Sequence, residues 1–264
     1  PSTGSATKGA DGDIQFLRWG NSGGQPVIVL APVDVKDCYL LTLHAFNLAE
    51  TFRCPVFIAA NKEISMTRET LDLDGLKRPE IVARKTADPG KPYLPFAVPE
   101  GRVTPDFLPI GGNRLVRQTS STHGPDGYIT TDPALIAETQ NRLLEKLESA
   151  VDSFTFFDEE PVSGADTLVI TYGVSARAAR DAVRTLSGTV RPASLLVLKT
   201  LWPVPEKRIR EAAADYRRVV VVEMNLGQYV REIQRLLPEK EIDFVGRMDG
   251  ELVKPGRILE VIHG

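Results

Sequence analysis

The amino end of the chain gathers small, hydroxyl and basic side chains in one short stretch. Ser2, Thr3, Gly4, Thr7 and Lys8 all fall within the sequence PSTGSATKGADGD. A glycine-containing loop of this kind offers main-chain N–H groups and hydroxyls, which suit a polar ligand or a phosphate. The GxxxxGK[ST] spacing of a P-loop is missing. From composition alone, the simpler interpretation is a frayed terminus.

A second polar group follows a run of four valines at 219–222 and consists of Glu223, Asn225, Gly227 and Gln228. The valine run predicts a strand that is buried on both faces, as in a parallel sheet. Apolar residues at helical spacing follow it, namely Leu226, Val230, Ile233 and Leu237. The polar group therefore lies in the turn at the carboxyl end of a strand, where ligands and partners dock in open α/β sheets. We expect an interface there, although most such turns only connect two elements.

Other chemically capable residues form no recognised constellation. Cys38 and Cys54 cannot by themselves hold an iron–sulfur cluster or a tetrahedral zinc, and no Ser-His-Asp, HExxH or CxxC pattern occurs. His44 lies beside the apolar face of a predicted helix and His123 lies in a turn, so structural roles suit both better than catalytic ones. The acidic run 158–160 is interpreted as solvated surface, and a paired-carboxylate site there stays open. We therefore assign no metal site and no catalytic residue to this chain.

Bulk composition excludes several classes of function. The 32 Lys and Arg against 35 Asp and Glu give a net charge of -3, which provides no basic surface for a nucleic-acid backbone. No apolar run approaches the ~20 residues that span a bilayer. Hydrophobic content of 42% and charged content of 25% are typical of a soluble globular chain. With few cysteines and no signal-peptide pattern, a reduced, cytoplasmic setting fits best.

The elements that must position these residues predict an α/β fold. The segment 25–60 reads as strand, helix and strand, with Asp34 as the helix N-cap. From 63 to 131 prolines interrupt every period, which indicates an ordered extended arm that Tyr93, Phe96 and Phe107 anchor. A helix follows from Asp132-Pro133. The segment 166–264 alternates strands and helices, with 193–203 as one of the strands and Ser175 as a further helix cap, and so predicts a parallel sheet covered on both faces.

Several of these segments, taken in order, resemble the α subunit of 2-oxoacid:ferredoxin oxidoreductases, most closely the 2-oxoglutarate-type branch. The matching segments are PSTGSATK, LAPVDVKDCYLLTLHAFNLAETFRCPVFI, STHGPDGYITTDP, YGVSARAARDAV, LLVLKTLWPVPE and VVVVEMNLGQYVREI. These are thiamine-diphosphate enzymes that decarboxylate 2-oxoacids to acyl-CoA and pass electrons to ferredoxin. The resemblance covers nearly the whole chain.

The resemblance implies a division into three parts. Residues 1–72 would be the second part of a pyrimidine-binding domain, 73–151 a connecting arm and helix, and 152–264 a transketolase carboxyl-terminal-like domain. Thiamine diphosphate would be shared with a β subunit that carries the diphosphate-binding domain, the magnesium and the [4Fe-4S] cluster. Ferredoxin, a 2-oxoacid and coenzyme A would be the other partners. The enzyme would be a cytoplasmic hetero-oligomer.

By the family pattern, Ser2, Thr3, Gly4, Thr7 and Lys8 would line the 2-oxoacid and thiazolium side of the site, with Thr3 the first candidate for contact. The family's catalytic glutamate and its carboxylate-binding arginine precede the PSTG motif, so neither lies in this sequence, and we expect a fragment or a split subunit. Two alternatives stay open. One is a non-catalytic α/β interaction module, and the other is a related thiamine enzyme of the transketolase or 2-oxoacid dehydrogenase type.

Overall fold

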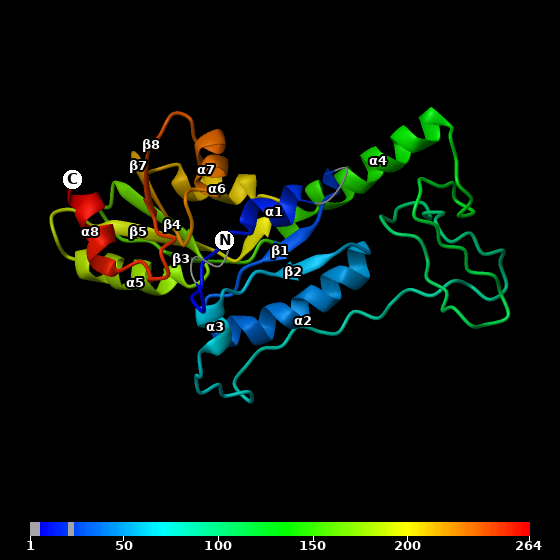
Figure 1. The fold of residues 1–264 in the computed structure, drawn as a ribbon, viewed down its shortest axis with the longest axis horizontal. Helices are drawn as coiled ribbons and strands as arrows, with labels where there is room; N and C mark the ends of the chain where they lie inside the picture. The colour runs from blue at the N-terminus through cyan, green and yellow to red at the C-terminus, as the bar shows by residue number, and fades with distance from the viewer. Residues whose placement is uncertain (1–5, 21–23) are drawn as a thin grey trace.

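The computed structural model describes residues 6–20 and 24–264 and has two sheets with an arm between them in sequence. Figure 1 shows both sheets side by side and the arm extending away from them. The elements of the first half are α1 (Ile14–Trp19), β1 (Ile28–Leu30), α2 (Val35–Phe52), β2 (Val56–Ile58), α3 (Lys62–Met66), α4 (Pro133–Glu148) and the 3₁₀ helix η2 (Val151–Phe154). No helix of the described residues is both long and apolar enough to cross a bilayer.

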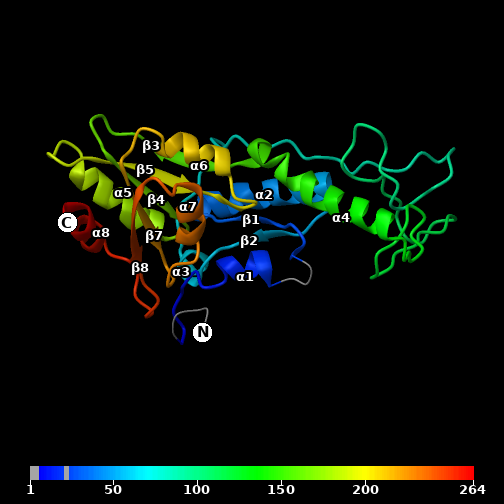
Figure 2. The ribbon, with the colours of Figure 1, turned by 90° about the horizontal axis from the view of Figure 1, so that it is seen from above.

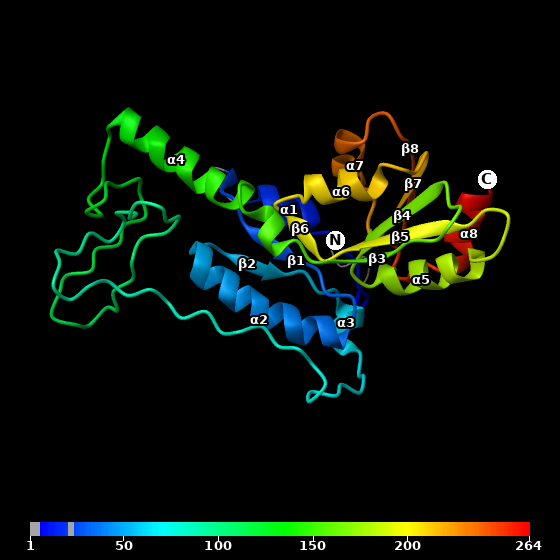
Figure 3. The ribbon, with the colours of Figure 1, turned by 180° about the vertical axis from the view of Figure 1, so that it is seen from behind.

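The second half forms the larger sheet, whose strand order is β3-β5-β4-β7-β8. Its strands are β3 (Phe157–Glu160), β4 (Thr167–Tyr172), β5 (Ala193–Leu198), β7 (Arg218–Glu223) and β8 (Glu241–Gly246). All neighbours are parallel except the edge pair β3 and β5. One face packs α6 (Glu206–Ala213) and α7 (Val230–Leu236), and the other packs α5 (Ser175–Leu186) and α8 (Pro255–His263), as Figures 1 and 3 show. The predicted α/β class is confirmed.

The smaller sheet joins the two halves of the chain through one strand. Its order is β2-β1-β6, with β1 and β2 parallel and β6 (Thr200–Trp202) antiparallel to β1. The segment 193–203, which we expected to be one strand, is therefore two strands in different sheets, and Lys199 stands at the break between them. Trp202, 2% exposed, donates from Nε1 to the Ile14 carbonyl at 2.9 Å, which ties β6 to α1. The halves thus share a core.

The arm from Thr67 to Asp132 contains no helix or strand among the described residues, only two isolated bridges. Figure 2 shows it reaching well beyond the body of the molecule, with α4 returning from it. The expected anchors make contacts inside the arm. The Phe96 ring lies 3.6 Å from His123, and Arg84 stacks 4.1 Å from the Phe107 centroid. An extended, ordered arm is what the proline spacing predicted.

Three local expectations were wrong. The acidic run 158–160 is more than solvated surface, because its backbone pairs with β5 as most of edge strand β3, and Arg180 and Lys199 pair with the carboxylates of Asp158 and Glu160. Ser175 is the first residue of α5 and does not cap it, because its buried Oγ has no hydrogen-bond partner in the described chain. Leu226 is 77% exposed, because α7 begins only at Val230.

Candidate functional site

The amino-terminal segment from Ala6 to Asp13 runs across the carboxyl ends of strands from both sheets. Figure 3 shows the first described part of this segment, in dark blue, beside α3. Lys62, the first residue of α3 after the Asn61 N-cap, donates from Nζ to the Thr7 carbonyl. Gly9 lies so close to α3 that an added Cβ would be 3.3 Å from the Lys62 nitrogen. A Cβ there would require the segment or α3 to shift by a few tenths of an ångström, which favours a glycine at this position.

The turn after β7 holds the same segment from the other side. The Asp11 N–H donates to the Met224 carbonyl at 2.8 Å, and Asn225 Nδ2 donates to the Asp11 carbonyl at 3.0 Å. Gln228 Nε2 donates to the Gly12 carbonyl at 2.6 Å, and Gln228 also accepts two hydrogen bonds from Gln15. The Met-Asn-Leu-Gly-Gln sequence is therefore a clamp on the chain's own amino-terminal segment.

Glu223 is the centre of this clamp and is fully buried. Its carboxylate accepts from the Tyr172 hydroxyl at 2.7 Å, from Asn225 Nδ2 at 2.9 Å, and from the main-chain N–H groups of Tyr229 and Val230 at 2.9 and 2.8 Å. The last two donors form the amino end of α7, where a negative charge is favoured. A buried carboxylate with four donors has its hydrogen-bonding capacity satisfied. Glu223 therefore stabilises the turn and is not a group held ready for a ligand.

Asp11 differs from Glu223 because its carboxyl group lacks such support. Asp11 as a whole is 9% exposed, and its Oδ2 atom is buried without a hydrogen-bond partner in the described chain. Burial, and then the nearby Glu223 carboxylate, raise the pKa of Asp11 from 3.8 to about 7. The facing Asn61 amide opposes this rise only in part. Asp11 is therefore a group in this segment that changes charge near neutral pH.

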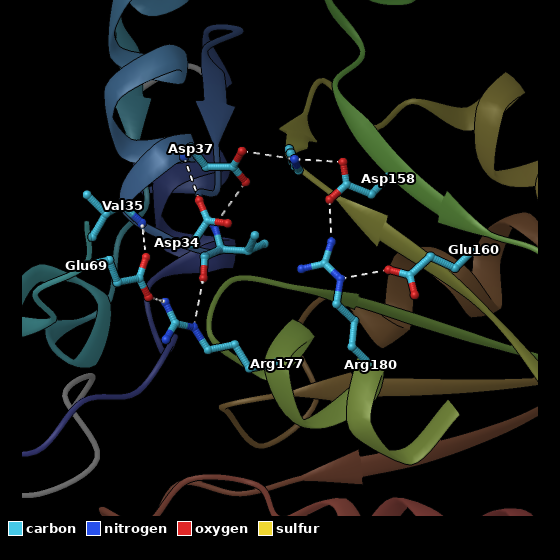
Figure 4. Close-up of polar contacts among 10 residues, drawn as sticks. Asp34, Val35, Asp37, Glu69, Asp158, Glu160, Arg177 and Arg180 are labelled. Atoms are coloured by element: carbon cyan, nitrogen blue, oxygen red, sulfur yellow. Dashed lines mark hydrogen bonds and ion pairs between the residues drawn. The ribbon is translucent and has the colours of Figure 1, made fainter. Parts of the chain in front are cut away.

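An ionic network forms the other contact between the halves of the chain, and Figure 4 shows it. Lys199 Nζ bridges Asp37 at 3.0 Å and Asp158 at 2.8 Å. Arg180 pairs with Asp158 and also with Glu160. Because Asp37 belongs to α2 and the other groups belong to the second half, the network fixes how the two sheets meet.

A further cation, Arg177, extends this contact to the segment that follows α3. Arg177 of α5 pairs with Glu69 and donates from Nε to the Val33 carbonyl at 3.3 Å. Glu69 in turn accepts from the Val35 N–H, at the start of α2, at 3.1 Å. The segment that follows α3 is therefore tied to both halves at once.

The structure describes only some of the residues that the sequence singled out. Ser2, Thr3 and Gly4 lie outside the described residues. Thr7 and Lys8 are exposed at the junction of the two sheets, and Thr7 adopts a φ of 60°, which is rare for a β-branched residue. Their proposed contact with substrate or cofactor stays a prediction.

The four residues expected at a partner interface lie mainly inside the chain. Glu223 and Asn225 are fully buried, Gly227 is buried at a φ of 89°, and Gln228 is half-buried against the amino-terminal segment. A contact of this turn with another subunit stays a prediction, and exposed Leu226 is the side chain it would use. Sequence reasoning missed Asp11, Asn61 and Lys199, since isolated polar residues in loops carry no periodic signal.

The sequence resemblance implies thiamine diphosphate as the cofactor. The residues available to contact it are those at the junction of the two sheets. Thr7 and Lys8 are exposed on the segment that contacts α3 and the turn after β7. Their hydroxyl and ammonium groups suit one side of a polar cofactor. Within residues 6–20 and 24–264, no cluster of three His, Cys, Asp or Glu side chains could hold a metal ion. The described residues thus fit a cofactor's organic part.

Two family models match the chain in succession. Residues 1–141 match the thiamine-diphosphate-binding domain of pyruvate flavodoxin/ferredoxin oxidoreductases. Residues 165–258 match core domain II of pyruvate:ferredoxin oxidoreductase. The first match covers β1 and β2 of the smaller sheet and the arm. The second covers β6 and every strand of the larger sheet except β3.

Curated relatives match over the whole chain. The 2-oxoglutarate synthase subunits KorA of Methanothermobacter thermautotrophicus and Methanothermobacter marburgensis are 33% and 34% identical over 99% and 100% of this chain. The matched part is 70% of each relative's length. Ketoisovalerate oxidoreductase subunit VorB of M. thermautotrophicus is 29% identical over 94% of this chain and 63% of its own length.

Solved structures show the same fold. The 2-oxoglutarate:ferredoxin oxidoreductase of Magnetococcus marinus, solved with 2-oxoglutarate, coenzyme A and succinyl-CoA, superposes with a TM-score of 0.79 at 24% identity, over 95% of this chain and 44% of that one. A split-gene transketolase superposes with a TM-score of 0.50 at 14% identity, over 96% of this chain and 60% of that one. With two family domains in order and a third of residues identical to KorA subunits, the chain belongs to the 2-oxoacid:ferredoxin oxidoreductase family, on its α-subunit side.

Proposed function

We propose that this chain serves in a thiamine-diphosphate-dependent 2-oxoacid:ferredoxin oxidoreductase that converts 2-oxoglutarate and coenzyme A to succinyl-CoA and carbon dioxide. The electron pair released on decarboxylation would pass to ferredoxin. The observation that carries the proposal is the similarity to 2-oxoglutarate synthase subunits KorA, at 33% and 34% identity over 99% and 100% of this chain. The identity to the ketoisovalerate relative is lower, at 29%, which favours 2-oxoglutarate among the 2-oxoacids.

The chain would act with a β subunit that contributes the diphosphate-binding domain, the magnesium and an iron–sulfur cluster. When bound, thiamine diphosphate would supply the nucleophilic carbon for the 2-oxoacid carbonyl and the electron sink for decarboxylation. This chain's part would be to hold the segment that carries the PSTG motif. The clamp formed by Asn225 and Gln228, and the contact from Lys62, support that role because both grip main-chain carbonyls a few residues after the motif.

Within the motif, Thr3 would contact substrate or cofactor through its hydroxyl, and Lys8 would favour a negatively charged substrate at the same opening. A cytoplasmic location agrees with the two cysteines, Cys38 and Cys54, which form no disulfide in the described chain. The arm and exposed Leu226 would contribute to contacts with partner subunits.

The test is reconstitution with the companion subunits and a dye-linked assay. We expect coenzyme A-dependent reduction of methyl viologen with 2-oxoglutarate, and a much smaller rate with 2-oxoisovalerate or pyruvate. Thr3→Val should raise KM or lower kcat for 2-oxoglutarate, whereas Thr42→Val, on an exposed face of α2, should not. A higher rate with a branched or small 2-oxoacid would contradict the substrate assignment, and unchanged kinetics in Thr3→Val would contradict its role.

A further inference from the structure

A small cavity lies between α4 and the arm, near the carboxyl end of α2. It has a volume of about 290 Å³, which is close to the lower end of the range for small-molecule sites. Three cations line it: Arg53 just after α2, and Arg142 and Lys146 on α4. No Asp or Glu is among the described residues that line it. The cavity is therefore electropositive within a chain whose net charge is -3.

The three cations make hydrogen bonds to main-chain carbonyls but no ion pair in the described chain. Lys146 Nζ donates to the Phe52 carbonyl at 2.6 Å, Arg53 to that of Pro105 at 3.4 Å and Arg142 to that of Val103 at 3.5 Å. Lys146 is 6% exposed. Burial lowers the pKa of this lysine, the nearby Cys54 opposes that shift, and the neighbouring Arg142 and Arg53 add to it. A buried ammonium group beside two like charges is costly unless an anion compensates it.

The remaining lining is polar and suited to an oxyanion. Hydroxyl groups come from Thr104, Ser120, Ser121, Thr122 and Thr139. His123 also lines the cavity, with its ring packed against Phe96. The carboxylate that affects Arg142, that of Glu138 one turn earlier, lies beyond ion-pair distance and lines the adjoining hollow instead. Hydroxyls and guanidinium groups together match the acceptor oxygens of phosphate, which outnumber those of a single carboxylate.

We infer that the cavity bounded by Arg53, Arg142 and Lys146 binds the phosphate group of a small molecule, either free phosphate or the phosphate of a nucleotide. The inference does not depend on the proposed function, since it uses only the cavity and its charges. The arm segments that carry Thr104 and His123 form one wall of the cavity and α4 the other. A bound phosphate would therefore also fasten the arm to α4.

The test measures thermal stability and binding of the full chain at constant ionic strength. Inorganic phosphate, pyrophosphate and ADP are titrated by calorimetry, with sodium chloride and succinate as matched controls. We expect phosphate compounds to bind and to raise Tm, and succinate to bind at least several-fold more weakly. Tighter binding of ADP than of pyrophosphate would assign the phosphate to a nucleotide, and the reverse order would assign it to a free phosphate.

Arg142→Gln is the main variant because this side chain is half-buried and makes only a long contact, so the fold should survive. We expect about ten-fold weaker phosphate binding, the loss of one charge-assisted hydrogen bond. Arg231→Gln, on an exposed residue of α7, is the matched control and should bind as the wild type does. Lys146→Met should also lose binding. Equal phosphate affinity in wild type and Arg142→Gln, no binding in wild type, or stronger binding of succinate than of phosphate would each overturn the inference.

Discussion

Replacing Asp11 by asparagine should make the protein more stable at pH 8 and remove a pH dependence between about 4 and 7. The Asp11 carboxyl is buried, has an unpartnered Oδ2, and faces Glu223 from β7, Tyr172 from β4 and Asn61 before α3. These surroundings raise its pKa from 3.8 to about 7. The folded protein therefore binds a proton more tightly than the unfolded chain does.

The sign and size follow from proton linkage. Below pH 4 the group is protonated in both states, so its full contribution to stability is present. As pH rises through 4 to 7, the unfolded chain ionises first, and the free energy of unfolding falls. A shift of about 3 pKa units corresponds to about 4 kcal/mol at most, at roughly 1.36 kcal/mol per unit. Because the groups around Asp11 can adjust to its negative charge, the measured free energy of unfolding should fall by less than this limit, by about 1–3 kcal/mol at pH 8.

Urea denaturation of wild type and Asp11→Asn at pH 5 and pH 8 measures this directly. The asparagine is neutral at both values, so the variant should be more stable than wild type at pH 8 and much closer to it at pH 5. Asp181→Asn, at an exposed position on α5, is the control and should leave the pH profile unchanged. A wild-type stability that rises from pH 5 to 8 and an Asp11→Asn profile parallel to it would refute the reasoning.

Two other perturbations test the junction between the sheets. Lys199→Met leaves Asp37 and Asp158 without their shared cation and should destabilise the chain by about 2–4 kcal/mol in urea unfolding. The control is Lys207→Met, which should cost under about 1 kcal/mol because the Lys207 side chain is 67% exposed. Similar losses of stability in both variants would contradict the network's role. Gly227→Ala forces a Cβ into a φ of 89° and to 3.3 Å from Val230, so Tm should fall by several degrees, and an unchanged Tm would mean that the turn relaxes freely.

Much of the fold follows from periodicity alone. The valine run of β7 and the apolar spacing of α2 predicted a buried strand and a packed helix, because burial on a sheet leaves a strong pattern. Asp34 was predicted as a cap, and its side chain does accept from the Asp37 N–H at 2.7 Å. The fold class needed nothing beyond these local signals.

The errors have physical causes. Edge strand β3 carries acidic residues that look like a loop until Arg180 and Lys199 are seen beside them, and no local pattern reveals partners so distant in sequence. The division of 193–203 between two sheets depends on β1, which lies over 160 residues earlier. Tertiary context decided both.

The candidate site was only partly predictable. The polar turn after β7 and the polar amino-terminal segment were each identified, but their direct contact was not, since nothing local to either indicates that Asn225 donates to the Asp11 carbonyl. The burial of Asp11 could not be inferred from a sequence in which aspartate sits between glycine and alanine. Long-range pairing of two loops is a property of the fold.

The central claim is that this chain supplies one side of a thiamine diphosphate site that a partner completes. The most direct measurement is the thermal stability of the chain alone and of its complex with companion subunits, each with and without thiamine diphosphate and Mg²⁺. At about 100 times Kd the cofactor should stabilise the complex by about 2.7 kcal/mol and leave the isolated chain almost unchanged. A complex whose Tm does not respond to the cofactor, or an isolated chain that responds fully, would contradict the claim.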